Sequence, residues 1–399
     1  MHSWTVLDAP VPATLDAPEA WALHGAARVS HAHETRRWGY PDLMEPAWYL
    51  IGNLQPHPYS IRKLLVAVPE GTTDPTADDV VGYCRVTLPL QDNTHLAEAG
   101  VYAHPDHVDE GIEDLLLTTA EALAAEHGRT SLMTWTEQAG EPDADAPGVL
   151  DPPTGSGRVD GTAYLARLLT SRGYRLEQAE RYSLLRLPVA EGLLDEHQAA
   201  AAERAGEEYR LVTWTDRTPD EWVDQVAVLE TRMSTDAPSA DLDIEEAPWD
   251  AERVRTWERQ LAASQHGYLM TAAEHVPTRT LAAFTVLQYP VDFPEIVFQE
   301  DTLVLREHRG RRLGMLVKAE NLRRLREVRP GAARVHTWNA EENSYMLDIN
   351  VALGFRLAGV AGMWQKRTGP VPVADDAAAV ADADDAAAVA APVPAAPVR

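Results

Sequence analysis

A basic segment with two glycines, Arg-Gly-Arg-Arg-Leu-Gly at 309–314, is the part of the chain best suited to chemistry. The apolar run 303–305 before it predicts a buried strand. Residues 313–328 after it predict a helix with most apolar side chains on one face. A turn between a strand and a helix points backbone N–H groups and the positive end of the helix dipole at one place. Arginines there add charge-assisted donors, so the segment suits a pyrophosphate.

The segment resembles the signature of the GNAT (GCN5-related N-acetyltransferase) superfamily, (Gln/Arg)-x-x-Gly-x-(Gly/Ala). Its positions are filled by Arg309, Gly310, Arg311, Arg312, Leu313 and Gly314. Arg312 stands where the family usually has its middle glycine. We therefore expect either that the turn is built without that glycine's freedom at positive φ or that Arg312 takes a right-handed conformation there. The resemblance implies that acetyl-CoA is the acyl donor and that these residues and Met315 bind it.

The resemblance also assigns a role to the strand before the turn. In this superfamily the strand carries a bulge, and its backbone donates a hydrogen bond to the thioester oxygen and pairs with the pantetheine arm. Those groups fall on Leu303, Val304 and Leu305.

Two carboxylates, Glu300 and Asp301, precede this run. Acyl transfer to an amine needs a base because only the neutral amine attacks. Glu300 shares side-chain parity with Thr302 and Val304, and the family often has a glutamate on this strand. We expect Glu300 to be the base, directly or through water. The alternative, weighed equally, is that both carboxylates form an acidic lining that attracts a cationic amine.

For the leaving thiolate, the family usually has a tyrosine in its last helix, in the pattern Asn-(x6)-Tyr-(x3)-Gly-Phe. The pattern matches at Asn343 and at Gly354-Phe355, but its tyrosine slot is Asn350. An amide can hydrogen-bond the sulfur without acting as an acid. Tyr345, five residues away, is expected on a different side of the helix. Asn343 is expected to contact the coenzyme or to cap the helix.

The chain contains an internal repeat. Residues 102–107 match 303–308 at an offset of 201, and 173–176 match 354–357 at an offset of 181. A longer loop at 137–161 in the first copy explains the difference. In the first copy the turn is acidic: Val108, Asp109, Glu110 and Glu113 replace Arg309, Gly310, Arg311 and Gly314. Because carboxylates repel a pyrophosphate, we expect the first copy to lack coenzyme and to wall the acceptor cleft of the second.

Composition narrows the classes of function. The net charge of −27 argues against nucleic-acid and anionic-membrane binding. Residues 300–329 nevertheless carry nine Lys or Arg. We expect four of these to form a solvated helix face, namely Lys318, Arg323, Arg326 and Arg329. The single Cys84 fits a reducing compartment. With no signal pattern and no long apolar run, a cytoplasmic protein is expected, and no histidine spacing predicts a metal site.

The resemblance and the internal repeat therefore predict an α/β (α+β) fold of two tandem GNAT domains, each a mixed, mostly antiparallel sheet flanked by helices. This arrangement resembles that of tandem GNAT enzymes such as mycothiol synthase. Expected limits are 1–190 for the degenerate domain, 191–208 for a linker, 209–368 for the acetyl-CoA-binding domain and 369–399 for a disordered tail. The expected function is direct transfer of the acetyl group to a small primary amine, and the acidic composition favours a cationic acceptor. The alternatives are another acyl-CoA, a protein lysine as acceptor, or a non-catalytic acyl-CoA-binding module.

Overall fold

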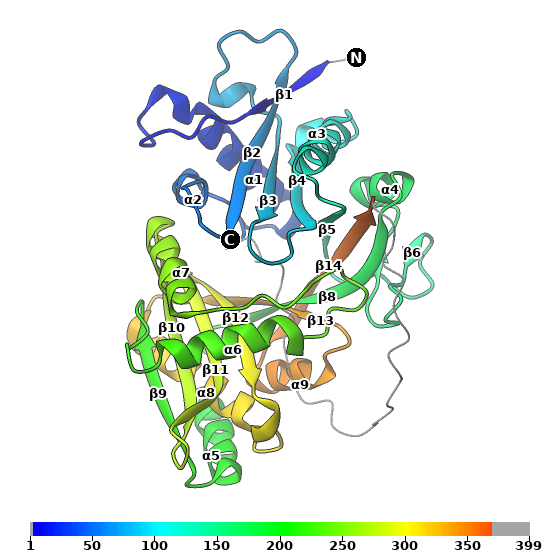
Figure 1. Cartoon of the computed structure of the whole chain (residues 1–399). Coiled ribbons are helices and arrows are strands. Elements are labelled where there is room, and N and C mark those ends of the chain that lie inside the picture. The colour runs from blue at the N-terminus through cyan, green and yellow to red at the C-terminus, as the bar shows by residue number, and fades with distance from the viewer. Residues whose placement is uncertain (1–2, 369–399) are drawn as a thin grey trace.

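The computed structural model describes residues 3–368, so the predicted disordered tail, 369–399, lies outside the described residues. Twelve strands within this range form one sheet, in the order β1-β2-β3-β4-β5-β14-β8-β13-β12-β11-β10-β9. Helices cover both faces of the sheet (Figure 1). Among residues 3–368, no helix is long and apolar enough to cross a membrane.

Two runs of elements with the same order build this sheet, and we call them the first and second copies. The first copy consists of β1 (Trp4–Asp8), α1 (Trp21–Trp38), α2 (Ala47–Asn53), β2 (Ser60–Pro69), β3 (Gly82–Pro89), β4 (Leu96–Ala103), α3 (Ile112–Glu126), β5 (Ser131–Ala139), α4 (Tyr164–Ser171) and β8 (Arg175–Arg186). The loop before α4 carries a small hairpin of β6 (Val149–Leu150) and β7 (Val159–Asp160).

The second copy follows helix α5 (Leu193–Ala205) and repeats the order. It consists of β9 (Tyr209–Thr215), α6 (Val223–Asp236), α7 (Ala251–Ala263), β10 (His266–His275), β11 (Thr280–Pro290), β12 (Ile296–Val304), α8 (Leu313–Val328), β13 (Arg334–Ala340), α9 (Ser344–Leu353) and β14 (Arg356–Arg367). The helix predicted at 313–328 is confirmed at both ends, because its apolar residues keep a helical period throughout.

The two copies exchange their last strands. β14, the last strand of the second copy, pairs antiparallel with β5 of the first copy over Ser131–Ala139. β8, the last strand of the first copy, pairs antiparallel with β13. β8 and β14 also pair with each other, which joins the two halves into a continuous sheet (Figure 1). Hydrogen bonding therefore crosses from each copy into the other.

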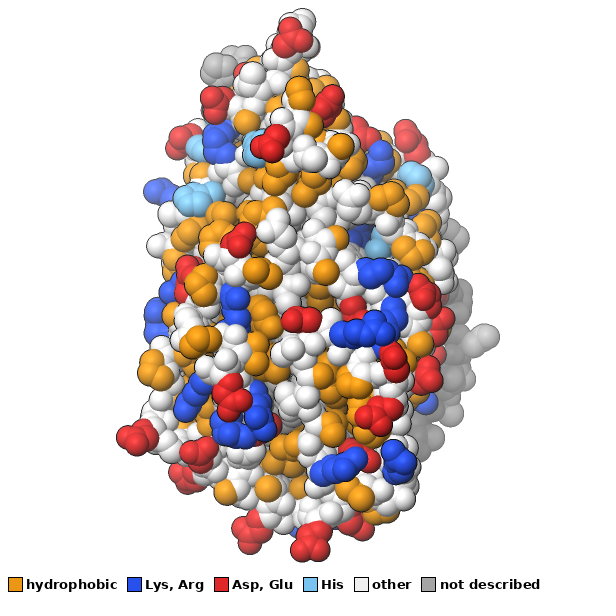
Figure 2. Space-filling model, turned by 90° about the vertical axis from the view of Figure 1, so that its left-hand side faces the viewer, with side chains coloured by type: hydrophobic (Ala, Val, Ile, Leu, Met, Phe, Trp, Pro, Cys, Tyr) orange, Lys and Arg blue, Asp and Glu red, His pale blue; other side chains and the backbone are white. Residues whose placement is uncertain are grey.

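Each copy has a large buried apolar cluster on each face of its half of the sheet. In the second copy, α5 and α8 cover one cluster, and α6 and α7 cover the other. The exchange reaches into the cores, because Val360 and Trp364 of β14 belong to the cluster under α3 of the first copy. On the face shown in Figure 2, acidic and basic side chains are interspersed with apolar groups.

Lys318 departs from its prediction. It was expected on a solvated helix face, but its side chain is 1% exposed, between α8 and α9. Its Nζ atom lies 3.9 Å from Sδ of Met346 and 5.8 Å from the centre of the Phe355 ring. Burial lowers the pKa of Lys318 to about 7. The prediction was wrong because the first ten residues of α8, 313–322, are all buried, so this part of the helix has no solvated face.

Candidate acyl-coenzyme A and acceptor site

Strand β12 leaves its neighbour β13 at the point where the predicted site begins. The two strands pair in parallel only over Ile296–Phe298. Immediately afterwards, β12 has one residue more than β11 between Gln299 and Thr302, so a bulge lies at Glu300 and Asp301. The bulge expected from the resemblance is therefore present, just before the predicted segment 303–305.

The backbone after the bulge alternates between the two neighbouring strands. Leu305 donates its N–H to the carbonyl of Ala282 on β11 at 2.9 Å. Because successive residues of a strand point their N–H groups to opposite sides, Leu303 also faces β11. Val304 and Thr302 face the open side, where β13 has moved away. Of the three predicted backbone positions, Val304 is thus the one with its N–H at the open edge.

The turn that follows β12 is built from two left-handed residues. Gly310 has a φ of 75° and Arg312 a φ of 59°, so the expectation of a right-handed Arg312 was wrong. The first copy has the same turn, with Asp109 at 66° and Gly111 at 83°. The glycine and the side-chain-bearing residue have changed places between the copies. The turn dictates the conformation, and a non-glycine residue tolerates it at a modest energetic cost.

The N-terminus of α8 is open to an anion. No side chain caps it, and its first turn contains no acidic residue. Arg311 and Arg312 are exposed beside it. Leu313 and Met315 have buried side chains and can offer only backbone atoms. A Cβ on Gly314 would lie 3.3 Å from Cδ1 of Ile349, which explains a glycine where α8 meets α9.

Arg309 has partners within the protein. It forms an ion pair with Asp236 at the end of α6, at 3.0 Å, and its Nε donates to the carbonyl of Val304 at 3.3 Å. Arg306 binds the same carboxylate at 2.9 Å. Asp236 thus fixes Arg309 against the end of β12.

The equivalent region of the first copy is filled by side chains. The acidic Glu113 and Asp114 occupy the first turn of α3. β4 runs beside β3 without a bulge, and it also leaves β5 after Glu98. A Cβ on Gly100 would lie 2.7 Å from the Trp135 ring, so this ring closes the gap between the strands. The equivalent Trp338 of the second copy instead stacks on Tyr182 with centroids 4.7 Å apart.

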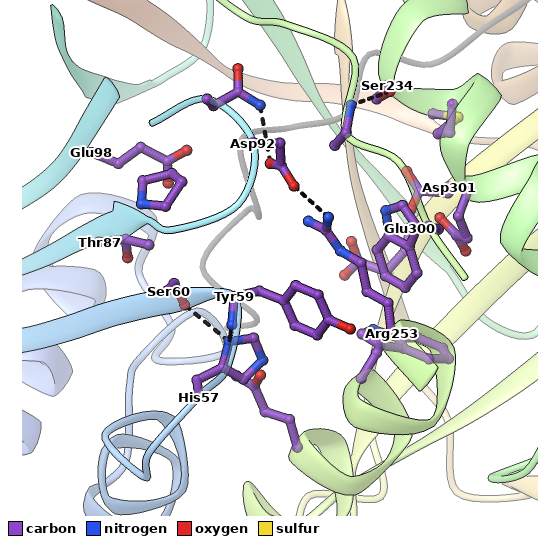
Figure 3. A pocket seen from close by; sticks show the side chains of 18 of the residues that line it. His57, Tyr59, Ser60, Thr87, Asp92, Glu98, Ser234, Arg253, Glu300 and Asp301 are labelled. Carbon is purple, nitrogen blue, oxygen red and sulfur yellow. Dashed lines mark hydrogen bonds and ion pairs between the residues drawn. The ribbon is translucent and has the colours of Figure 1, made fainter. Parts of the chain in front are cut away.

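A cavity of about 350 Å³ lies between the two copies (Figure 3). The first copy contributes, among others, Tyr49, His57, Tyr59, Arg62, Arg85, Asp92 and Glu98. The second copy contributes, among others, Glu230, Trp249, Arg253, Trp257, Glu300, Asp301 and Trp338. Figure 3 shows His57, Ser60, Thr87 and Glu98 on one wall, facing Arg253, Glu300 and Asp301 on the other.

Three carboxyl groups meet at the second-copy wall. Burial and the neighbouring Asp301 raise the pKa of Glu300 to about 8. Burial raises the pKa of Asp301 to about 6. Burial and Asp301 also raise the pKa of Glu230, on α6, well above its usual value. Each of these carboxyl groups is therefore a weaker acid than usual. Glu300, which becomes ionised as the pH rises through about 8, can then take a proton from a bound amine.

The predicted leaving-group residues lie apart from this cluster. Asn350 is buried, and its Nδ2 donates to Oδ1 of Asn339 at 2.7 Å, while its own Oδ1 has no partner within residues 3–368. Tyr345 packs against the core under α8, away from the cavity lining. Asn343 caps α9 by accepting a hydrogen bond from the N–H of Met346 at 3.2 Å. Of the two expectations for Asn343, the structure shows the cap.

Sequence reasoning missed most of the cavity. Glu230, Arg62, Glu98 and the tryptophans of the α7 region were not singled out as site residues. They come from both copies and meet only because the strand exchange places the copies side by side. A lone glutamate in an amphipathic helix, such as Glu230 in α6, gives no signal in one sequence.

Comparisons with known proteins agree on the fold. No family model and no curated protein sequence matches the chain. Among solved structures, the chain is similar to a tandem GNAT protein from the clavulanic acid biosynthesis pathway, with 24% identity, a TM-score of 0.65, and coverage of 93% of this chain and 100% of that one.

Two further structures are similar. One is a GCN5-related N-acetyltransferase from Sphaerobacter thermophilus, with 16% identity, a TM-score of 0.56, and coverage of 92% of this chain and 96% of that one. The other is a fungal GCN5-related glucosamine N-acetyltransferase region within a multi-domain protein. It has 14% identity and a TM-score of 0.56, and the match covers 92% of this chain and 38% of that one. The chain thus has the tandem GNAT fold, and the prediction of that fold class is confirmed.

Proposed function

We propose that the protein is an N-acyltransferase that moves an acetyl group from acetyl-CoA to the primary amine of a small molecule held between the copies. The observation that carries the proposal is the continuity of three features of the second copy. The open, uncapped start of α8 adjoins the open edge of β12, and the bulge of β12 lies in the cavity that contains Glu300. Diphosphate, thioester and amine can then be aligned along one path.

The residues of the chain suggest how each group acts. The turn 309–312 and the first N–H groups of α8 would hold the diphosphate, and bound acetyl-CoA would supply the activated acetyl group. The N–H of Val304 would polarise the thioester oxygen. Glu300 would accept the ammonium proton, because its pKa of about 8 is close to the pH at which the enzyme works. A free thiol has a pKa of about 8.5, so the thiolate can leave without a tyrosine acid.

The test measures binding and turnover separately. Calorimetry with acetyl-CoA should show binding, and release of free thiol in the presence of an amine panel should show transfer. Arg309→Glu should weaken acetyl-CoA binding, because it removes a donor at the turn and faces Asp236 with a like charge. Arg306→Glu, at an exposed position that shares Asp236, is the matched control and should have the smaller effect. No heat with millimolar acetyl-CoA would end the proposal.

One observation favours a second candidate, a non-catalytic acyl-CoA-binding module. The position of the usual tyrosine is Asn350, which is buried and bonded to Asn339, and Tyr345 lies elsewhere. Binding of acetyl-CoA without thiol release for any amine would favour this candidate.

A further inference from the structure

Apart from the ion pair that Arg253 of the second copy forms with Asp92 of the first copy, the two walls of the cavity carry different ionisable groups. The second-copy wall carries the carboxyl groups of Glu230, Glu300 and Asp301. The first-copy wall carries two arginines from neighbouring strands, Arg62 on β2 and Arg85 on β3. An acceptor that spans the cavity meets both walls.

Arg62 is the cation on this wall that lacks a counter-ion. Its Nε donates to Oγ of Ser60 at 3.0 Å and its Nη1 to the carbonyl of Asn53 at 3.4 Å, both neutral acceptors. Among residues 3–368, no carboxylate oxygen lies within 4.0 Å of its guanidinium. By contrast, Arg85 pairs with Glu45 at 2.7 Å, and Arg253, across the cavity, pairs with Asp92. A partly buried guanidinium without an anion is costly, unless a ligand supplies one.

The groups that face Arg62 do not neutralise it. They are Glu98, Arg85, Tyr49 and His57. Burial raises the pKa of Glu98 to about 7, so that carboxyl is only partly ionised at neutral pH. Burial and nearby arginines lower the pKa of His57 to about 4, so it is neutral. Tyr49 is buried and its pKa lies above its usual value. The positive charge of Arg62 is therefore left for a ligand.

From this geometry we infer that the acceptor is a dipolar amine, whose amino group lies at Glu300, Asp301 and Glu230 and whose carboxylate binds Arg62. The inference rests on the proposed function and refines it. A purely cationic acceptor, which the acidic composition suggested, would be attracted by one wall and repelled by Arg62. Arg62 is thus a specificity-determining residue, supplied by the copy whose own coenzyme turn is acidic.

The experiment uses the full chain and a matched ligand series. β-Alanine, γ-aminobutyrate and δ-aminovalerate are each compared with the amino alcohol and the diamine of the same length, by calorimetry. At the best-fitting length, we expect the amino acid to bind about tenfold or more tightly than the amino alcohol, because a charge-assisted hydrogen bond to Arg62 is gained. Arg62→Gln should remove this preference, and Arg62→Lys should keep part of it. Arg326→Gln, an exposed position on α8 with the same loss of charge, should leave it unchanged.

Several results would overturn the inference. They are equal binding of acids and alcohols, preference for the diamines, no binding of any amino acid, or an equal loss for all ligands in Arg62→Gln. The wild-type ligand series decides the matter even if Arg62→Gln does not fold. Calorimetry with acetyl-CoA on the same sample tests the proposed function separately. Coenzyme binding with no preference for dipolar amines would therefore refute this inference alone.

Discussion

Glu300 shows how one residue can be identified from sequence while its properties cannot. Its place on the strand before the turn follows from the sequence and the family resemblance. Its raised pKa depends on Asp301, on the bulge that turns both side chains toward the cavity, and on burial by the first copy. Those causes arise only in the folded molecule, so sequence alone left base and acidic lining equally weighted.

If Glu300 is the base, activity should follow its ionisation. For the free enzyme, kcat/KM should rise with pH through about pH 8, because the carboxylate, not the carboxylic acid, accepts the proton. Glu300→Gln should lower kcat by roughly 10²–10⁴-fold and remove this rise. Asp301→Asn should keep the rise but move it to lower pH, since it removes a neighbouring negative charge. An unchanged pH profile in Glu300→Gln would assign the base to another group.

Lys318 allows a prediction about stability. Its pKa in the folded protein, about 7, lies below its usual value of 10.5. The unfolded chain therefore holds more protons between these values, and stability rises with pH across that window. Lys318→Met should stabilise the protein by roughly 4 kcal/mol near pH 7, with the gain shrinking toward pH 10. Urea unfolding at several pH values measures it. A pH-independent difference would show that packing, not charge, is responsible.

At the scale of elements, the sequence predicted helices and strands best where a periodic pattern of apolar residues extends over many positions. The limits of α8 were predicted at both ends. The conformation of the turn before it was mispredicted, because glycine was taken as necessary for a positive φ. The second copy has its glycine at one left-handed position and Arg312 at the other. Arg312 places a positive charge at the start of the helix, at the cost of a left-handed backbone conformation that glycine would adopt more easily.

The balance between backbone strain and positive charge can be tested by substituting Arg312. Arg312→Gly should raise the free energy of unfolding by about 1 kcal/mol, because glycine adopts a φ of 59° without a Cβ clash. The same substitution should weaken acetyl-CoA binding, since a cation beside the helix start is lost. Arg312→Ala, which loses the charge but keeps the strain, is the control. It should weaken binding equally without the gain in stability. Equal stability of the two variants would show that the turn is not strained.

At the scale of the whole molecule, the internal repeat made the tandem fold predictable. The exchange of last strands was not predictable, because β8 and β14 have similar patterns of apolar residues. Either strand could pair with β5 or with β13. The cavity shares this origin. Its walls belong to different copies, and only the continuous sheet fixes how they face each other. The sequence therefore pointed to the turn and to β12, which belong to one copy, but not to the cavity, whose walls need both copies.

The exchange predicts that a residue late in the chain stabilises the first copy. Trp364 on β14 is 1% exposed within the first-copy core, and its Nε1 donates to Oγ1 of Thr136 at 3.0 Å. Trp364→Ala should cost about 3–5 kcal/mol and should speed amide hydrogen exchange mainly in β3, β4 and β5. Phe355→Ala is the matched control, because Phe355 lies nine positions earlier but in the second-copy core. It should speed exchange mainly in β11, β12 and β13. If Trp364→Ala instead loosened the second copy first, β14 would pair in solution with its own half, and the cavity between the copies would need a different architecture.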